Sequence, residues 1–152
     1  MDVRRVPADA EAARLLLAEY MQEIERRLGR PLQPSEYPDA GAAELEPPGG
    51  MLLVAFDDGV AVACGAVRVL GRGVAEVKRM YVAPQARGRG LGRTLLGELE
   101  RGAAELGCGT VRLDTMGAMA EASALYRSAG YAPIADYNGN PLAGLWMERR
   151  LA

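Results

Sequence analysis

The sequence predicts one domain of mixed α/β (α+β) structure, in which seven strands form a mostly antiparallel sheet flanked by about four helices. Three features predict it: the chain has 152 residues, 49% of them are hydrophobic and 25% charged, and segments of strand-like and helix-like periodicity alternate along it. Length and composition suit one globular domain that buries a core. We see no internal repeat or linker within residues 1–152, so a single domain is expected.

In the first half of the chain we expect a strand, a long helix and an antiparallel meander. Asp2 to Val6 alternates in polarity as a strand does, and Pro7 begins a helix whose apolar residues recur about every 3.6 positions up to Leu28. Turn sequences rich in Asp and Gly separate the apolar runs that follow. The expected elements after the long helix are a short helix at 35–45 and strands at 51–56, 60–70 and 74–82.

In the second half, helices and strands alternate. Pro84 ends the strand before it because proline has no backbone N–H, and glycines then precede a run of helical periodicity that Gly107 closes. The expected elements are helices at 91–106 and 120–128 and strands at 110–114, 131–137 and 145–151.

A glycine-rich turn precedes the helix at 91–106, and we expect it to bind an anion. Glycines let a ligand approach the backbone closely, and the first N–H groups of a helix and the positive end of its dipole favour negative charge. Arginines add positive charge at the same place, so phosphate is the favoured ligand. The residues concerned are Arg87, Gly88, Arg89, Gly90, Gly92 and Arg93.

Two nucleotide-binding motifs fit this turn less well. A P-loop requires Lys followed by Ser or Thr, whereas Arg93 precedes Thr94 here. A dinucleotide-binding GxGxxG is nearly matched, with Asp114 in the place of a ribose-binding acid, but its third glycine falls one residue early and residues 84–87 separate the strand from the glycines. A nucleotide-dependent oxidoreductase stays a weaker alternative.

Composition argues against several other classes of protein. The chain has no His, so Ser/His/Asp and Cys/His catalysis would lack their base, and Cys64 and Cys108 form no metal-ligand spacing, so no metal is expected. A formal net charge of −2 argues against a nucleic-acid partner. No segment reads as a signal peptide or membrane span, so we expect a cytoplasmic protein without a membrane partner.

Two motifs resemble those of the GNAT acetyltransferases. Gln85 to Gly90, QARGRG, resembles the Q/RxxGxG/A signature of that family, and ALYRSAGY resembles its LYxxxGF/Y motif through Leu125, Tyr126, Gly130 and Tyr131. The run from Glu76 to Tyr131 is also similar to one bacterial subfamily, in which EMKRLYV precedes the turn and LDT, then a Met, precede the LY pair. Many members carry an Asn where this chain has Met119, so the role of that Asn cannot be transferred.

The resemblance implies a GNAT fold, with the sheet splayed between its fourth and fifth strands, here at 74–82 and 110–114. In the family the pantetheine arm of acetyl-CoA lies in that gap, so Met80 and Val82 are expected to exchange backbone hydrogen bonds with it. The pyrophosphate is then expected on the glycine-rich turn and the start of the helix, at Arg87, Gly88, Arg89, Gly90, Leu91, Gly92 and Arg93.

The resemblance also implies an N-acetyltransferase, which moves the acetyl group of its cosubstrate acetyl-CoA to a primary amine by direct attack in a ternary complex. An alkylamine, with a pKa near ~10, must first lose a proton. Glu76 stands where several members carry a glutamate base, although it could instead be a strand residue paired with Lys78 or Arg79. Tyr126 is expected to contact the cosubstrate and protonate the departing thiolate, although it could instead be a core aromatic.

The sequence leaves the acceptor open between a small amine and an amino-acid-like molecule. Arg68 and Arg79 could grip a substrate carboxylate, and the turn at 138–142 could overhang the pocket or only join two strands. Acidic and aromatic residues could line a site for a cationic amine, although the glutamates could equally be the solvated face of the helix; they are Glu19, Tyr20, Glu23, Tyr37 and Tyr137.

Two further possibilities concern function and assembly. A catalytically silent CoA-binding sensor or partner module is the alternative function, and the presence of Tyr126 favours the enzyme over it. A homodimer could form through the apolar segment LAGLWM, at 142–147, although Trp146 could equally belong to the core.

Overall fold

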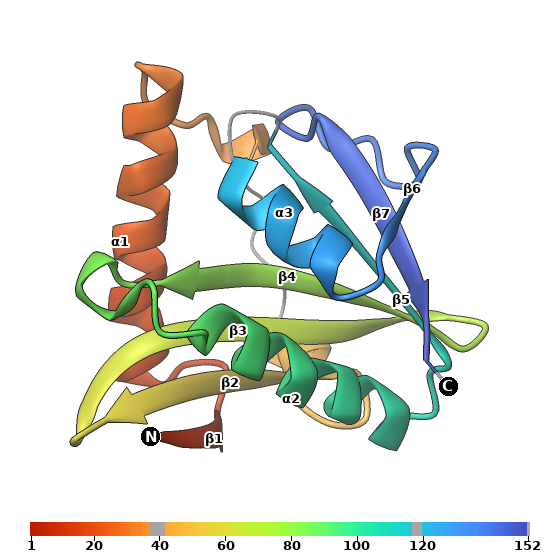
Figure 1. Ribbon diagram of the computed structural model, residues 1–152, viewed down its shortest axis with the longest axis horizontal. Coiled ribbons are helices and arrows are strands. Elements are labelled where there is room, and N and C mark those ends of the chain that lie inside the picture. Colours follow the sequence, from red (N-terminus) through yellow and green to blue (C-terminus); the bar gives the residue numbers. More distant parts are fainter. Residues whose placement is uncertain (37–41, 117–119, 152) are drawn as a thin grey trace.

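The structure, a computed structural model, describes residues 1–36, 42–116 and 120–151. These residues form a seven-stranded sheet in the order β1-β2-β3-β4-β5-β7-β6, in which only β4 and β5 pair in parallel (Figure 1). The strands are β1 (Asp2–Val6), β2 (Gly50–Asp57), β3 (Val60–Gly71), β4 (Val74–Val82), β5 (Thr110–Thr115), β6 (Ala132–Ile134) and β7 (Leu145–Arg150). The predicted seven-stranded, mostly antiparallel sheet is thus confirmed.

Three α-helices and three short 3-10 helices lie among the described residues. They are α1 (Glu11–Leu28), α2 (Leu91–Glu105), α3 (Ala120–Ser128), η1 (Pro34–Glu36), η2 (Ala42–Leu45) and η3 (Pro84–Ala86). Where we expected a short helix at 35–45, the structure has η1 and η2, and residues 37–41 between them lie outside the described part of the chain.

Two tight turns connect β2 to β3 and β3 to β4. Asp58 and Gly59 have φ of 51° and 80°, and Arg72 and Gly73 have φ of 55° and 75°. Two successive positive φ values characterise the type I′ turn, whose twist matches that of the flanking strands. The meander predicted from the turn sequences therefore forms, and it leads the chain along β4 to the glycine-rich turn.

The sheet opens between β4 and β5. Their register pairs are only Val74 with Thr110, Ala75 with Val111 and Glu76 with Arg112, and beyond them the two strands diverge (Figure 1). On its other edge β5 pairs along its whole length with β7. The predicted splay between the fourth and fifth strands is therefore present, and it begins at Glu76.

A β-bulge in β4 changes which side chains face which side of the sheet. Cys64 pairs with Tyr81 and Ala66 with Lys78, so three steps on β4 oppose two on β3, and Arg79 has φ of 57° within the bulge. Val77 packs with α2 before the bulge, and Met80 packs on that same side after it. Without the extra residue, strand alternation would point Met80 to the opposite face.

The core consists of two clusters on opposite faces of the sheet. The α2 side holds Leu95, Leu96 and Leu99 with Tyr126 and Tyr131, among others. The α1 side is centred on Leu16, Leu52, Val54, Cys64 and Tyr81. Helices thus cover both faces, which is why β2 and β3 are apolar on nearly every residue rather than on alternate ones.

The end of the chain departs from the expected strands in two respects. The strand expected at 131–137 is β6 alone, because the carboxylate of Asp136 accepts hydrogen bonds from the N–H groups of Asn138 and Gly139, at 2.9 and 2.7 Å, and so begins a turn. Trp146 is half-buried and belongs to neither cluster, whereas its neighbour Met147 is fully buried.

Candidate active site

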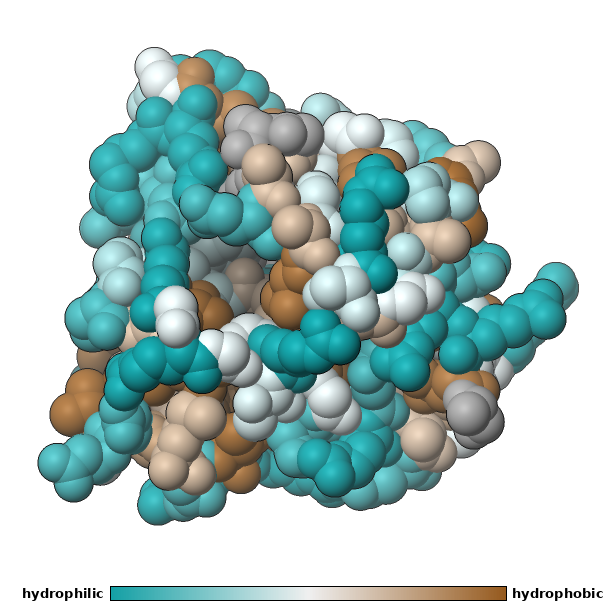
Figure 2. Space-filling model, in the orientation of Figure 1, coloured by the Kyte–Doolittle hydropathy of each residue, from teal (hydrophilic) through white to brown (hydrophobic). Residues whose placement is uncertain are grey.

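Two cavities meet beside α3. The first, the turn groove, has a volume of about 610 Å³ and lies between α1, the glycine-rich turn and α3; Figure 2 shows it as a recess with hydrophobic side chains along its wall. The second, the carboxylate cavity, has about 330 Å³ and is lined by β4, β5, η1 and residues 138–142. Tyr20, Met80, Ala122 and Tyr126 line both, so these four residues mark the junction.

The glycine-rich turn leaves the start of α2 open toward the groove. Gly88 and Gly90 have φ of 81° and 73°, in the left-handed region that favours glycine, and no atom lies within 4 Å of a Cβ built at either position. Gly90 is the N-cap of α2, and no side chain caps the helix there. The N–H groups of the first turn therefore lack a side-chain acceptor, as in an anion site.

Arg87 contacts two elements beside the groove, α1 and the end of β4. Its Nη2 forms an ion pair with Oε1 of Glu23 on α1 at 2.8 Å, and its Nε donates to the carbonyl of Val82 at 2.9 Å. Its guanidinium also lies 5.8 Å from the ring centroid of Tyr81. Glu23, a candidate for amine binding, thus serves the turn and lines the groove rather than the carboxylate cavity.

The other two arginines of the turn also contact protein groups. Arg89 forms an ion pair with Asp57 at 2.9 Å, and Arg93 donates to the hydroxyl and the carbonyl of Ser128 at 2.8 and 3.2 Å. Arg87 and Arg93 line the groove, whereas Arg89 does not. Each guanidinium has five N–H donors, more than these contacts use.

Tyr126 is buried at the junction, with 6% of its surface exposed. Its ring packs edge-on against Tyr131 with the centroids 6.0 Å apart. Burial, and then the charge of Asp114, raise the pKa of Tyr126 to about 12. The phenol is therefore protonated at neutral pH, and Tyr126 is both a core aromatic and a lining residue.

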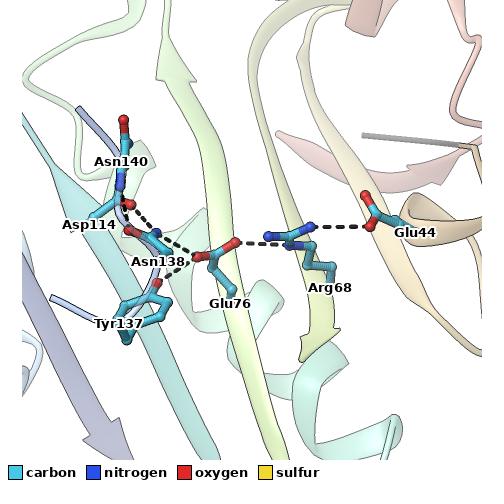
Figure 3. A network of polar contacts seen from close by, with 7 residues as sticks. All are labelled: Glu44, Arg68, Glu76, Asp114, Tyr137, Asn138 and Asn140. Atoms are coloured by element: carbon cyan, nitrogen blue, oxygen red, sulfur yellow. Dashed lines mark hydrogen bonds and ion pairs between the residues drawn. The ribbon is translucent and has the colours of Figure 1, made fainter. Parts of the chain in front are cut away.

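Glu76 is the centre of a polar network (Figure 3). Only 5% of Glu76 is exposed, so its side chain is buried. One carboxylate oxygen accepts from Nε of Arg68 at 2.9 Å, and the other accepts from the hydroxyl of Tyr137 at 2.6 Å and Nδ2 of Asn138 at 3.2 Å. The ion-pair partner of Glu76 is therefore Arg68, directly opposite it on β3, and not Lys78 or Arg79 as the sequence suggested.

The same network accounts for Arg68 and Tyr137. Arg68 also pairs with Glu44 at 3.2 Å, so two carboxylates neutralise the guanidinium that we considered as a grip for a substrate. Burial, and then the hydrogen bond to Glu76, raise the pKa of Tyr137. The Tyr137 hydroxyl therefore stays protonated and can donate to Glu76.

Asp114 is the second carboxylate of the cavity and has a different environment. It accepts from the side-chain amides of Asn138 and Asn140, at 2.5 and 3.3 Å, and no ion pair joins it to a Lys or Arg in the described ranges. Burial raises the pKa of Asp114, and the two amide hydrogen bonds lower it in part. The charge of Lys78 is a smaller cause that lowers this pKa, and among the described residues Asp114 makes no ion pair.

Asn138 connects the two carboxylates in one defined orientation. Its Oδ1 accepts from the indole N–H of Trp146 at 2.9 Å and from the backbone N–H of Asn140 at 3.0 Å, so its Nδ2 must face Glu76 and Asp114. The turn at 138–142 therefore lines the carboxylate cavity. Sequence reasoning did not single out Asn138, and it gave Asp114 no role in the acceptor site, placing it only in the LDT segment of the resemblance and in the less favoured dinucleotide motif.

The remaining predicted residues lie as follows. Met80 faces the junction, and Leu91 and Gly92 line the turn groove. Glu19 accepts a hydrogen bond of 3.4 Å from Tyr81 and lines neither cavity. Tyr37 and Met119 lie outside the described residues.

Comparisons with known proteins agree with this arrangement. The profile of the acetyltransferase (GNAT) family matches residues 15–131. An N-acetyltransferase of Schizosaccharomyces pombe is 35% identical over 143 residues, which cover 91% of this chain and 85% of that protein. An IAA acetyltransferase of Azospirillum brasilense is 37% identical over 140 residues, covering 89% and 90%. A Klebsiella pneumoniae structure described as an acyl-CoA N-acyltransferase is 30% identical with a TM-score of 0.78, covering 99% and 97%.

A splayed sheet with a glycine-rich turn before a helix defines a class of acyl-CoA-dependent transferases. The chain belongs to the GNAT family of acetyltransferases, and it is an acetyl-CoA-dependent acetyltransferase. The residues present fit that cosubstrate: the uncapped start of α2 suits a pyrophosphate, and the groove leads from it to Met80 and Tyr126.

The described residues contain neither a cluster of metal ligands nor a membrane-spanning helix. No three Cys, Asp or Glu side chains among them are grouped to hold a metal ion. Nor does that part of the chain contain a helix long and apolar enough to cross a bilayer.

Proposed function

We propose that the protein transfers the acetyl group of acetyl-CoA to the primary amine of a small molecule by direct attack within one ternary complex. The observation that carries this proposal is the meeting of two cavities at Tyr126 and Met80. A donor in the turn groove and an acceptor in the carboxylate cavity would approach each other there. Cys64 and Cys108 line neither cavity, so a cysteine-bound acetyl group has no support.

The turn groove is the proposed donor site. Acetyl-CoA supplies an acetyl group that its thioester bond activates. The backbone of Gly88, Gly90 and the first turn of α2 would receive the pyrophosphate, with Arg87 and Arg89 beside it. The backbone of β4 at Met80 and Val82 would orient the pantetheine amides, since β4 has no partner from β5 there.

The proposed chemistry moves protons at both the nitrogen and the sulfur. The amine nitrogen forms a bond to the acetyl carbon as the carbon–sulfur bond breaks. The nitrogen goes from an ammonium to an amide and loses two protons, the sulfur gains one and leaves as a thiol, and one proton is released to solvent. Tyr126 is the proposed proton donor, because it lines both cavities and its phenol is protonated at neutral pH. Glu76 and Asp114 are the two proposed acceptors, and Glu76 already receives three hydrogen bonds.

An acceptor screen tests the proposal. The purified protein is assayed for acetyl-CoA-dependent thiol release with amines, amino acids, polyamines and peptides, and products are identified by mass. We expect an N-acetylated small molecule, and loss of turnover in Tyr126→Phe. Calorimetric binding of acetyl-CoA without turnover of any acceptor would favour the silent CoA-binding module, and binding of NAD but not acetyl-CoA would overturn the donor as well.

A further inference from the structure

Lys78 and Asp114 face each other across the opening of the sheet. Glu76 and Arg112 form the last register pair of the parallel strands β4 and β5. Lys78 and Asp114 are each two residues further along, so both side chains lie on the same face as that pair. The bulge at Arg79 comes only after Lys78. Both residues line the carboxylate cavity.

Most charged groups of this cavity are neutralised within the protein. Arg68 and Glu76 pair with each other. Glu36 accepts two hydrogen bonds from the Arg30 guanidinium, at 2.7 and 2.6 Å. Arg79, which also lines the cavity, makes a contact of its own within the protein, while its Nε and Nη2 are buried and donate no hydrogen bond among the described residues. The two ion pairs leave a ligand little uncompensated charge at Arg68, Glu76 and Glu36.

One cation and one anion of the cavity make no ion pair within the described part of the chain. There no hydrogen bond or ion pair engages the ammonium of Lys78, and only neutral amides donate hydrogen bonds to Asp114. The charge of Lys78 acts on Asp114 only as a minor cause that lowers its pKa. Burial, the largest cause in each case, lowers the pKa of Lys78 and raises that of Asp114. A ligand of the opposite charge at each residue would offset this cost of burial.

We propose that the acceptor is a small amino-acid-like zwitterion, which binds with its amino group at Asp114 and its carboxylate at Lys78. This inference rests on the proposed function of the same cavity. Asp114 lies at the end of the cavity nearer the proposed reaction centre, because its charge acts on Tyr126 at the junction. A cavity of about 330 Å³ is at the small end of ligand sites, which suits an amino acid better than a peptide.

The proposal distinguishes the zwitterion from other acceptors. A simple monoamine would satisfy Asp114 but leave the half-buried Lys78 without a partner. A polyamine would bring a second cation toward Lys78, which is unfavourable. Of the two arginines that the sequence suggested as carboxylate grips, Arg68 is committed to Glu76 and Glu44, and Arg79 lies in the bulge after Lys78. We assign the role to Lys78, because it lies opposite Asp114 across the opening of the sheet.

The first test compares matched acceptors with the wild-type enzyme. Each L-amino acid that turns over in the thiol-release assay is paired with the amine that lacks its carboxylate and with its carboxamide. We expect kcat/KM to be roughly ten- to a hundredfold higher for the amino acid, the range expected for one charge-assisted contact. Amines that react as well as their amino acids would overturn the zwitterion while leaving the proposed function intact. If none of the tested acceptors caused thiol release, the proposed function itself would be contradicted.

Variants then test the two ends separately. Lys78→Met should raise KM for the amino acid by roughly tenfold or more and leave the matched amine unchanged, whereas Asp114→Asn should impair both. Arg72→Met, in the exposed β3–β4 turn, is the matched control for loss of one positive charge. Acetyl-CoA binding by calorimetry shows that each variant is folded. An equal loss for both acceptors in Lys78→Met would refute the carboxylate contact.

Discussion

Two buried tyrosines, five residues apart, form a matched pair for testing catalysis. Tyr126 lines both cavities, whereas the hydroxyl of Tyr131 donates to Glu100 at 2.8 Å and lines neither cavity. If Tyr126 protonates the departing sulfur, Tyr126→Phe should lower kcat by about 10²-fold or more at saturating acetyl-CoA. Tyr131→Phe should affect stability more than kcat, and equal rates for the two variants would remove Tyr126 from the mechanism.

The carboxylates Glu76 and Asp114 differ in what they can do when the pH changes. A base works only when deprotonated, and the pKa of Asp114 is raised, so kcat/KM should fall as the pH drops through that raised value. Asp114→Asn should abolish this acidic limb, and Glu76→Gln should leave it in place. The measurement is kcat/KM against pH for one acceptor. A limb that disappears only in Glu76→Gln would assign the proton transfer to Glu76.

At the scale of elements, the arginines of the glycine-rich turn act together with the start of α2. Arg87→Ala with Arg89→Ala should raise KM for acetyl-CoA roughly tenfold or more, since two charge-assisted contacts are lost. Arg72→Ala is the control for loss of one positive charge, because Arg72 does not line the turn groove. Glu23→Gln separates the phosphate role from the ion pair with Arg87: it should leave KM unchanged or lower it. An unchanged KM in the double variant would end the proposed phosphate role.

Two glycines show how much the packing of an element depends on its neighbours. A Cβ on Gly50, at the start of β2, would lie 2.0 Å from the carbonyl oxygen of Glu44 and 2.5 Å from that of Val67, whereas no atom lies within 4 Å of a Cβ on Gly97 in α2. Gly50→Ala should therefore destabilise the fold by about 2 kcal/mol or more. Gly97→Ala should stabilise it by roughly 0.5–1 kcal/mol. Urea unfolding measures both, and a tolerated Gly50→Ala would contradict the close approach of η2 to β2.

At the scale of the whole molecule, the two thiols report on global unfolding. Cys64 and Cys108 are both buried, and burial raises both pKa values, that of Cys64 to about 12. The native protein should therefore react slowly with a thiol reagent at pH 8, and denaturant should release two thiols per chain. The count is made with and without denaturant. Fast reaction of the native protein would show that a core cluster opens readily, and it would add background to the thiol-release assay.

The arrangement of the sheet also bears on assembly. Its edges are β1 and β6, and β6 pairs with β7 at Trp146, Met147 and Glu148, so the backbone of these three residues cannot pair with a second chain. The indole of Trp146 donates to Asn138 and has a role within its own chain. A homodimer through residues 142–147 stays a prediction.

Features that depend on a few neighbouring residues could be predicted from the sequence. The turns at 58–59 and 72–73, the glycine-rich turn, and the bounds of β4 and α3 follow from turn residues and periodicity, and the two motifs located Tyr126 and the donor site. Each of these features depends on residues that lie close together in the sequence, so it can be predicted without the tertiary structure. The order of the strands and the opening beside β4 followed from the resemblance to the family.

Only the tertiary structure decided which polar groups meet in the cavity. The bulge at Arg79 turns Met80 toward the junction, the register of β3 and β4 sets Arg68 opposite Glu76, and the turn after β6 brings Asn138 to Asp114. These contacts join residues far apart in the chain. Their partners depend on register and packing, which the whole molecule determines at once. The sequence by itself thus determined the donor chemistry, and the tertiary structure decided which charges are left for the acceptor.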